Sequence, residues 1–308
     1  MDHIGKRLTI RLHDSRGGYR DIVGILESAS SLRHKDGHEI TFSQDEISIY
    51  REIIPLPDKA GKGAPLTIRV IELEKILNST WIAAEEKMLG KWLMRASGKY
   101  TMRANSVLPL GAPPFGEPEK EIDQAINEVV SYYQDRKIAP VFHLPLPIYE
   151  ELAEYLLLHG WIEKLRAQVQ IIDISFEDIT SESRIEVSTD CTQEWLEIQG
   201  DERLLSLMER SPARYYILKR DNVAVAVARA GIFEEWAVIT RFYVKPDFRG
   251  LGIGQEMMAQ IFNDLHARKI TKAALQVNSE NEPAIALYRK LGFRKHHEYS
   301  YLIRESDL

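Results

Sequence analysis

Short runs of alternating apolar and polar residues fill the first fifty residues of the chain. One run is Leu8-Thr-Ile-Arg-Leu12, and others lie at 22–26, 39–42 and 47–53, with glycine-containing turns between them. A period of two residues predicts strands with one buried face, and several short strands joined by such turns predict a small β-barrel. We expect this unit, residues 1–56, to be an accessory domain without chemistry of its own.

Residues 57–66 interrupt the pattern. They are rich in Pro, Gly and Lys and show no apolar period, which predicts a linker and a domain boundary. Beyond it, segments with apolar residues at helical spacing alternate with strand-like runs. The predicted helices are 68–84, 119–136 and 148–159, and the predicted strands are 92–96, 101–108, 139–144 and 165–174.

The last part of the chain repeats this order of elements. Tyr155–Trp161 and Ala286–Phe293 share a local pattern in which a helix ends at a glycine followed by an aromatic residue. We interpret the repeat as an internal duplication, with halves at 67–180 and 181–308. The predicted fold is α/β (α+β), with mixed sheets flanked by helices. The second half is predicted to have helices at 192–199, 202–209, 255–265 and 282–290, and strands at 215–219, 223–229, 236–244, 273–277 and 298–303.

Composition narrows the class of protein. The 308 residues carry a formal net charge of −6, which disfavours a general nucleic-acid binder. The single cysteine, Cys191, excludes an internal disulfide, and its neighbours Asp190 and Thr192 offer no activating base. The histidines show no metal-ligand spacing, and no apolar run has the length of a membrane span or a secretory signal. We therefore expect a cytoplasmic protein without a metal.

The stretch Ile239–Gly254 carries the candidate chemistry. A strand ends near Val244, and Arg249-Gly-Leu-Gly-Ile-Gly254 leads into an amphipathic helix. The first N–H groups of a helix lack intrahelical partners and favour an anion, and glycines let a ligand approach the backbone. The combination predicts a phosphate cradle, although a plain strand-to-helix turn is the alternative. The glycine spacing fits neither the dinucleotide fingerprint nor a P-loop.

Two motifs together resemble the GNAT superfamily of N-acetyltransferases. Arg249, Gly252 and Gly254 match its first signature, Arg or Gln, two residues, Gly, one residue, then Gly or Ala. The second, an Asn-led helix that ends in Gly-aromatic, is matched by Asn281–Phe293. The whole chain is similar to actinobacterial acetyltransferases with an SH3-like N-terminal domain, a degenerate GNAT half and an intact one. The segment Pro109–Gly116 stands where the first half would have its cradle, and its prolines offer no N–H groups.

The resemblance implies acetyl-CoA as the donor. The strand backbone of Phe242, Tyr243 and Val244 would bind the pantetheine arm. Asn281, an expected N-cap, would contact coenzyme A, and Asn278 is either a second contact or an ordinary loop residue. The pyrophosphate would be held by Arg249 and by the N–H groups of Gly250, Leu251, Gly252, Ile253 and Gly254.

Tyr288 is the catalytic candidate. A tyrosine at this place in the family protonates the departing thiolate, and the alternative is an aromatic residue packed between leucines. Some members place a glutamate that acts as general base near the position of Val238. Here Glu234 and Glu235 lie just upstream and could deprotonate an ammonium through water, but a solvated turn explains them better. A base is unnecessary where proximity of amine and thioester suffices.

These observations predict an N-acetyltransferase that transfers an acetyl group to a primary amine by direct attack. The acceptor, a small molecule or a peptide, cannot be identified from the sequence, and residues 68–180 are expected to wall its cleft. The alternatives are a non-catalytic acyl-CoA-binding sensor or scaffold, and a barrel that reads nucleic acid or peptide. The acidic balance of the chain disfavours the last of these.

Overall fold

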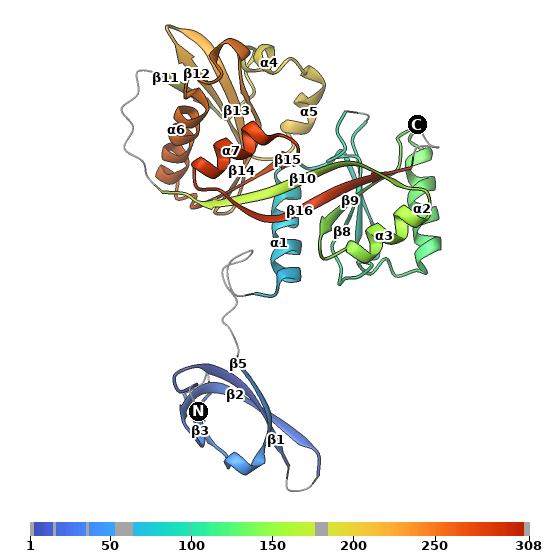
Figure 1. Ribbon diagram of the computed structural model, residues 1–308, viewed down its shortest axis with the longest axis vertical. Coiled ribbons are helices and arrows are strands. Elements are labelled where there is room, and N and C mark those ends of the chain that lie inside the picture. Colours follow the sequence, from blue (N-terminus) through green and yellow to red (C-terminus); the bar gives the residue numbers. More distant parts are fainter. Residues whose placement is uncertain are drawn as a thin grey trace. The chain divides into compact units, whose positions relative to one another are not determined.

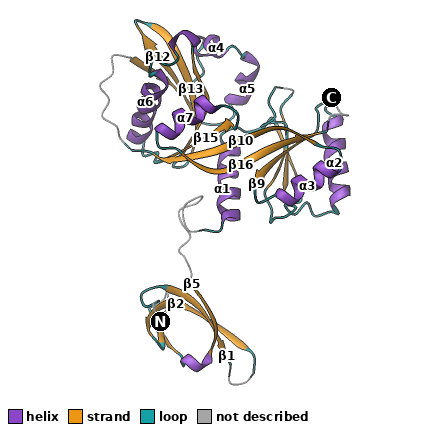
Figure 2. Ribbon diagram, in the orientation of Figure 1, coloured by secondary structure: helices purple, strands orange, loops and turns teal. Residues whose placement is uncertain are grey.

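The computed structural model divides the chain into two compact units, Met1–Pro65 and Leu66–Leu308 (Figures 1 and 2). The structure describes residues 3–14, 17–34, 37–52, 64–98, 100–175 and 184–304. The predicted linker, 57–66, and the predicted connection at 175–183 fall mostly outside these ranges.

The N-terminal unit is a five-stranded antiparallel sheet in the order β4-β3-β2-β1-β5. Alternating side chains of β1 and β2 are buried, as their period of two predicts. The predicted barrel is wrong, because β4 and β5 are the two edges of the described sheet and do not pair. The resemblance to SH3-like barrels is therefore not confirmed. The elements are β1 (Arg7–His13), β2 (Tyr19–Ser28), β3 (Ser31–Arg33), β4 (Glu39–Thr41), η1 (Gln44–Glu46) and β5 (Ile47–Glu52).

The second unit is built on one eleven-stranded mixed sheet in the order β11-β12-β13-β14-β15-β10-β16-β9-β8-β7-β6. The first-half elements are α1 (Leu66–Ser79), β6 (Glu85–Leu89), β7 (Trp92–Ala96), β8 (Val107–Pro109), α2 (Ile122–Gln134), β9 (Val141–Leu146), α3 (Glu150–Leu158) and β10 (Ile162–Asp173). The second-half strands are β11 (Arg184–Ser188), β12 (Ala213–Arg220), β13 (Val223–Phe233), β14 (Trp236–Val244), β15 (Lys272–Asn278) and β16 (Arg294–Ile303). Its helices are α4 (Gln193–Gln199), η2 (Glu202–Leu204), α5 (Leu205–Met208), η3 (Pro246–Phe248), α6 (Ile253–Ala267) and α7 (Glu282–Lys290).

The two halves repeat the same core topology and exchange their last strands. β8 and β9 pair in parallel with α2 between them, as β14 and β15 do with α6 between them. By this equivalence β10 would complete the first half and β16 the second. Instead β10 pairs with β15, β16 pairs with β9, and the two exchanged strands pair with each other. Figure 1 shows β10 and β16 bridging the two parts of the sheet.

The Gly-aromatic pattern has the same structure in both halves. Gly160 follows α3 with φ of 83°, and Gly292 follows α7 with φ of 92°. The N–H of Trp161 bonds the carbonyl of Leu156, five residues back, and the N–H of Phe293 bonds the carbonyl of Tyr288. This is the hydrogen bonding of a Schellman cap, which needs a left-handed residue.

Helices cover both faces of the second-half sheet. The core between the sheet and α6 and α7 contains Met257, Phe262 and Tyr288. On the other face, Trp195 of α4 packs in a core with Trp81 and Ala104 of the first half, and its Nε1 donates to the Ala228 carbonyl at 3.0 Å. Contacts of this kind join the halves into one body.

Two predictions in the first half need correction. The expected strand at 101–108 contains a turn over 102–106, and only Val107–Pro109 forms a strand. The side chain of Asn105 causes this, because it bonds the Ser97 N–H and the Thr101 carbonyl and so holds a compact loop. The predicted helix 68–84 ends earlier, at Ser79, and is followed by a strand that was not predicted, β6. The side chains of β6 are mostly exposed, so the strand gives no apolar alternation in the sequence.

A buried ionic cluster, Glu74, Arg95, His143 and His297, ties α1 to three strands of the sheet. Glu74 of α1 is 1% exposed, accepts a hydrogen bond from His297 Nε2 of β16 at 2.8 Å, and faces His143 Nε2 at 3.7 Å. Arg95 of β7 donates to His143 Nδ1 at 3.1 Å and to the Asn78 side chain of α1. Because α1, β7 and β9 belong to the first half and β16 to the second, the cluster joins both.

The protonation states in the buried ionic cluster follow from its geometry. Arginine only donates, so His143 accepts at Nδ1 and is neutral with its proton at Nε2. Burial accordingly lowers the pKa of His143 to about 3, with Glu74 acting in the opposite direction. Burial alone would raise the pKa of Glu74, but the facing imidazoles and Arg95 lower it to about 2.

Replacing Glu74 by Ala should lower the free energy of unfolding by about 3–5 kcal/mol, because it leaves the buried Arg95 charge without its counter-ion. All five tryptophans lie in the second unit, so urea unfolding followed by tryptophan fluorescence reports on that unit. Lys75→Ala, an exposed change one residue along α1, is the control and should stay within about 0.5 kcal/mol of wild type. Equal effects of the two substitutions would refute a structural role for the cluster.

Acid should destabilise the second unit through His143. The unfolded chain takes up a proton on this residue below about pH 6.5, whereas the folded protein does so only near pH 3. The free energy of unfolding therefore falls as the pH is lowered through this window, by about 1.4 kcal/mol per pH unit for one group. Urea titrations at pH 7, 6 and 5 should show a shallower decline for His143→Gln than for wild type. Parallel declines would contradict the assignment.

Candidate functional site

β14 and β15 are parallel neighbours that separate halfway along their length. Their pairing runs from Trp236 opposite Lys272 to Ile239 opposite Leu275 and then stops. β14 continues to Val244 and β15 to Asn278, but over these last residues the two strands no longer pair with each other. Beyond Ile239, β14 therefore has a free edge on that side, to which an extended ligand can add as a strand.

A bulge in β14 lies where the separation begins. The register with β13 shifts between Val227 and Arg229, and Arg241 has φ of 53°. A bulge bends its strand and re-aims the side chains there. Gln199 of α4 supports it by donating from Nε2 to the Arg241 carbonyl at 2.7 Å. The bent segment continues into Phe242–Val244, so the structure places these three predicted donor-binding residues on the free part of β14.

The glycine loop lies at the N-terminus of the 15-residue helix α6. Gly250 and Gly252 have φ of 76° and 81°, and a Cβ on either would meet no atom within 4 Å. In the described part of the chain, none of the N–H groups of Gly250–Gly254 donates to a protein acceptor. A left-handed turn, an open surface and free donors at a helix N-terminus together fit a pyrophosphate.

Gly254 serves a different purpose from the two glycines before it. A Cβ there would lie 2.9 Å from Leu287 Cδ2 and 3.7 Å from Phe242 Cε1. Its lack of a side chain lets α7 approach the start of α6 and β14, so the glycine signature also fixes the position of the next helix.

The approach of α7 brings Tyr288 to the separated part of β14. Its ring centroid lies 6.4 Å from that of Phe242 and 5.7 Å from that of Phe293. The side chain is 8% exposed, and burial raises its pKa to about 12, so the phenol keeps its proton at neutral pH. The packing and the catalytic interpretations of Tyr288 are thus compatible with one position.

The two asparagines occupy the connection between β15 and α7. Asn281 caps α7, its Oδ1 accepting from the Ala284 N–H at 3.2 Å. Asn278 ends β15, and its Oδ1 accepts from the Glu280 N–H at 2.9 Å, the bond of an Asx turn. The cap at Asn281 is confirmed, whereas coenzyme A contacts of both residues stay predictions.

Arg249 precedes the loop. Its Nε donates to the Val244 carbonyl at 3.0 Å, and its guanidinium lies 5.5 Å from the Tyr243 ring centroid. The side chain therefore links the end of β14 to the loop, with the rest of the guanidinium available to an anion.

The acidic residues considered as bases lie at the wrong end of β14. Glu234 and Glu235 form the turn before Trp236, and Glu235 pairs with Lys272 at 3.6 Å. At about 3.3 Å per strand residue, this turn is roughly 25 Å from Tyr243. Val238 is fully buried. The interpretation of the two glutamates as a surface turn is supported.

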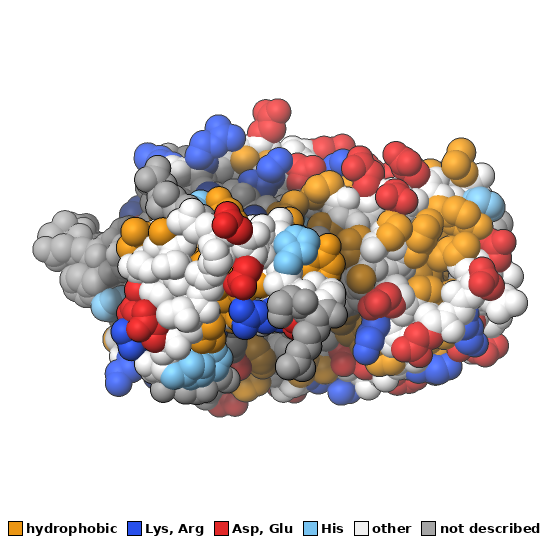
Figure 3. All heavy atoms as spheres, turned by 90° about the horizontal axis from the view of Figure 1, so that it is seen from below, with side chains coloured by type: hydrophobic (Ala, Val, Ile, Leu, Met, Phe, Trp, Pro, Cys, Tyr) orange, Lys and Arg blue, Asp and Glu red, His pale blue; other side chains and the backbone are white. Residues whose placement is uncertain are grey.

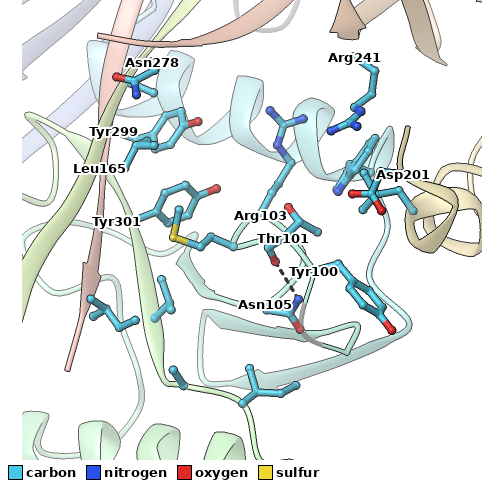
Figure 4. Close-up of a pocket in the computed structure, with 18 of the residues that line it drawn as sticks. Tyr100, Thr101, Arg103, Asn105, Leu165, Asp201, Arg241, Asn278, Tyr299 and Tyr301 are labelled. Carbon is cyan, nitrogen blue, oxygen red and sulfur yellow. Dashed lines mark hydrogen bonds between the residues drawn. The ribbon is translucent and has the colours of Figure 1, made fainter. Parts of the chain in front are cut away.

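A cavity of about 720 Å³ adjoins the separated strands and is lined by both halves of the second unit (Figure 4). Arg241 of β14 and Asn278 of β15 connect it to the gap between those strands. Residues 68–180 contribute to its wall, as expected, whereas Arg103, Tyr299 and Tyr301 were not among the predicted site residues. The two tyrosines, spaced two apart on β16, carried a signal, because such residues share one face of a strand.

The described residues of the first half form no equivalent of the glycine cradle. Trp92 Nε1 donates to the Phe115 carbonyl at 2.7 Å, and the Tyr149 hydroxyl donates to the Gly111 carbonyl at 2.6 Å. Of the N–H groups in the Pro109–Gly116 loop, those of Leu110, Ala112 and Gly116 already donate to acceptors of the chain, and the prolines have none. Leu156 stands in the cap position that Tyr288 occupies in the second half, so the hydroxyl is missing as well.

Other chemistries find little support. Burial raises the pKa of Cys191 to about 11, which disfavours a thiolate nucleophile. Across the described residues, no group of three or more His, Cys, Asp or Glu side chains is placed to hold a metal ion. None of the helices in the described ranges has the length and hydrophobicity needed to cross a membrane.

Full-length relatives are similar to this chain over most of its length. A protein of Mycobacterium tuberculosis named "Probable histone acetyltransferase Rv0428c" is 23% identical over 318 residues, covering 98% of this chain and 96% of the relative. "Uncharacterized N-acetyltransferase YobR" of Bacillus subtilis is 23% identical over 250 residues, covering 76% of this chain and 98% of the relative.

Solved structures share the fold. A "GCN5-related N-acetyltransferase from Kribbella flavida" superposes with a TM-score of 0.61 at 15% identity, covering 77% of this chain and 95% of that one. A functionally unknown protein from Staphylococcus epidermidis gives a TM-score of 0.55 at 13% identity, covering 75% and 96%. The family model "Probable histone acetyltransferase Rv0428c C-terminal" matches residues 67–302. The chain belongs to this family of GNAT-type N-acetyltransferases, in a tandem arrangement of one degenerate and one intact half.

Proposed function

We propose that the protein transfers the acetyl group of acetyl-CoA to a primary amine by direct attack, without a covalent enzyme intermediate. The observation that carries this proposal is the set of N–H groups at Gly250–Gly254, which have no acceptor among the described residues and lie at the N-terminus of α6, beside the free edge of β14. Membership of an N-acetyltransferase family supports the reaction class.

Each part of the donor has a matching part of the chain. The cradle at Gly250–Gly254, with Arg249 beside it, would bind the pyrophosphate. Phe242–Val244 would bind the pantetheine amides as an added strand. This alignment runs the donor along β14, with its thioester towards Arg241, Tyr288 and Asn278. The cavity of about 720 Å³ would then receive the acceptor.

In the proposed reaction the neutral amine attacks the thioester carbonyl, and the tetrahedral adduct collapses with cleavage of the C–S bond. The amine loses a proton to solvent, and the departing sulfur takes one from the Tyr288 hydroxyl. Because burial raises its pKa, this phenol is protonated at neutral pH and has a proton to give, and it would regain one from solvent after the thiol leaves. Holding amine and thioester together supplies much of the acceleration without a dedicated base.

Calorimetric titration with acetyl-CoA should show binding to wild type and at least a 100-fold weaker binding to Gly252→Glu. The new carboxylate would lie among the N–H donors and repel the pyrophosphate, a loss of about 3 kcal/mol. Gly160→Glu is the matched control, because Gly160 has φ of 83° and an equally open Cβ position in the first half. Both variants carry the same left-handed strain, about 1–2 kcal/mol, so only the cradle variant should lose affinity.

Failure of wild type to bind acetyl-CoA, or equal weakening in both glycine variants, would contradict the donor site. The loop would then be a plain strand-to-helix connection.

Tyr288→Phe should lower kcat about 100-fold or more while leaving the Kd for acetyl-CoA unchanged, because it removes only the proton donor. Thiol release would be followed with the amine that wild type uses fastest in a panel. Tyr132→Phe is the control, because that hydroxyl is buried and has no hydrogen-bond partner among the described residues. Acetyl-CoA binding without thiol release for any amine would favour the non-catalytic sensor instead.

A further inference from the structure

The cavity beside the donor strand is cationic, although the protein as a whole is acidic. The net charge is −6, and on the face seen in Figure 3 acidic and basic side chains are interspersed. Three of the four charged residues that line the cavity are basic: Arg103, Lys137 and Arg241. The fourth, Asp201, already pairs with the exposed Arg203 at 2.8 Å. The walls therefore present an excess of positive charge.

Neither arginine forms an ion pair among the described residues, although the charge of Asp201 partly opposes the burial that lowers the pKa of Arg241. The Arg103 guanidinium lies over the Trp81 ring, 5.6 Å from its centroid, and makes no hydrogen bond or ion pair in the described ranges. Nε of Arg241 is buried without a hydrogen-bond partner among the described residues. Figure 4 shows both guanidinium groups directed into the same part of the cavity. A buried donor such as Arg241 Nε is usually satisfied, and the half-buried Arg103 guanidinium is directed into the same space (Figure 4), so the pair fits an anion from outside the chain.

Two buried hydroxyls complete the lining. Tyr299 and Tyr301 are each 4% exposed, and Figure 4 shows their hydroxyl groups pointing into the cavity from β16. Burial raises the pKa of both phenols, so they stay protonated and donate hydrogen bonds at neutral pH. Guanidinium and phenol donors converging on one space suit a carboxylate or a phosphate.

We propose that the acceptor is a small amine that carries an oxyanion, a carboxylate or a phosphate, which binds between Arg103 and Arg241. This inference rests on the proposed function. Arg241 directly precedes Phe242 on the donor strand, so a molecule anchored there holds its amine near the thioester. A cavity of about 720 Å³ is in the usual range for a small-molecule site.

The test is a panel of amines in matched pairs, with acetyl-CoA as donor and thiol release as the readout. Each α-amino acid, ω-amino acid and aminoalkyl phosphate is compared with its neutral amide or alcohol. We expect kcat/KM to be about 100-fold higher for the anionic member, since charged hydrogen bonds are lost with the anion. The carboxylate and phosphate arms show which oxyanion the site takes.

Variants assign the effect to the two arginines. Arg103→Gln and Arg241→Gln should each raise KM for the anionic acceptor about 10- to 100-fold and leave KM for its neutral partner within about twofold. Arg103→Lys should recover part of the loss, because it restores the charge without the planar fork. Arg294→Gln, on β16 but paired with the exposed Asp173, removes one positive charge elsewhere and should change neither KM. Melting temperatures and acetyl-CoA titrations establish that each variant is folded and binds the donor.

Equal use of anionic and neutral amines, or equal effects of the arginine variants on both, would overturn the inference. It would also be overturned if the variants impaired only an acyl donor with a free carboxylate, such as succinyl-CoA, because the anion would then belong to the donor. These outcomes leave the proposed function standing. Failure of wild type to bind acetyl-CoA would remove the proposed function itself.

Discussion

The exchange of the last strands is the constraint on which the second unit depends. β10 pairs with β15 and β16 with β9, so neither half can complete its own sheet without the other. If the halves separated, the backbone groups of β10 and β16 that bond across the exchange would lose their partners. Such groups are costly to bury unpaired. Glu74 adds a charge interaction to the same junction by bonding His297 of the exchanged β16.

The exchange also gives the first half a place beside the proposed active site. β16 places Tyr299 and Tyr301 between the halves, and the loop held by Asn105 places Arg103 opposite them. The second half provides the bent β14, the glycine loop and Tyr288. The strand exchange therefore keeps the first half fixed as a wall of the cavity, although its described residues form no glycine cradle.

Local features were predictable from the sequence and long-range ones were not. The helix Glu282–Lys290, its Asn281 cap and the strand end at Val244 follow from side-chain period, capping and breakers, all of which act within a few residues. The Asn105 turn was missed, because a single side chain overrode a strand-like run. The open five-stranded sheet, the strand exchange and the buried pairing of Glu74 with His297 depend on contacts between distant segments, which no local pattern records.

The net charge of the protein does not predict the charge of its cavity, because the two depend on different groups. Exposed charges are screened within about 10 Å at moderate salt, so a total of −6 spread over the surface has little influence inside a cavity. Arg103 and Arg241 act at short range in a partly desolvated space, where each is felt more strongly. In the proposed acceptor site the local charge is therefore set by these few groups, and an acidic protein can present a cationic cavity.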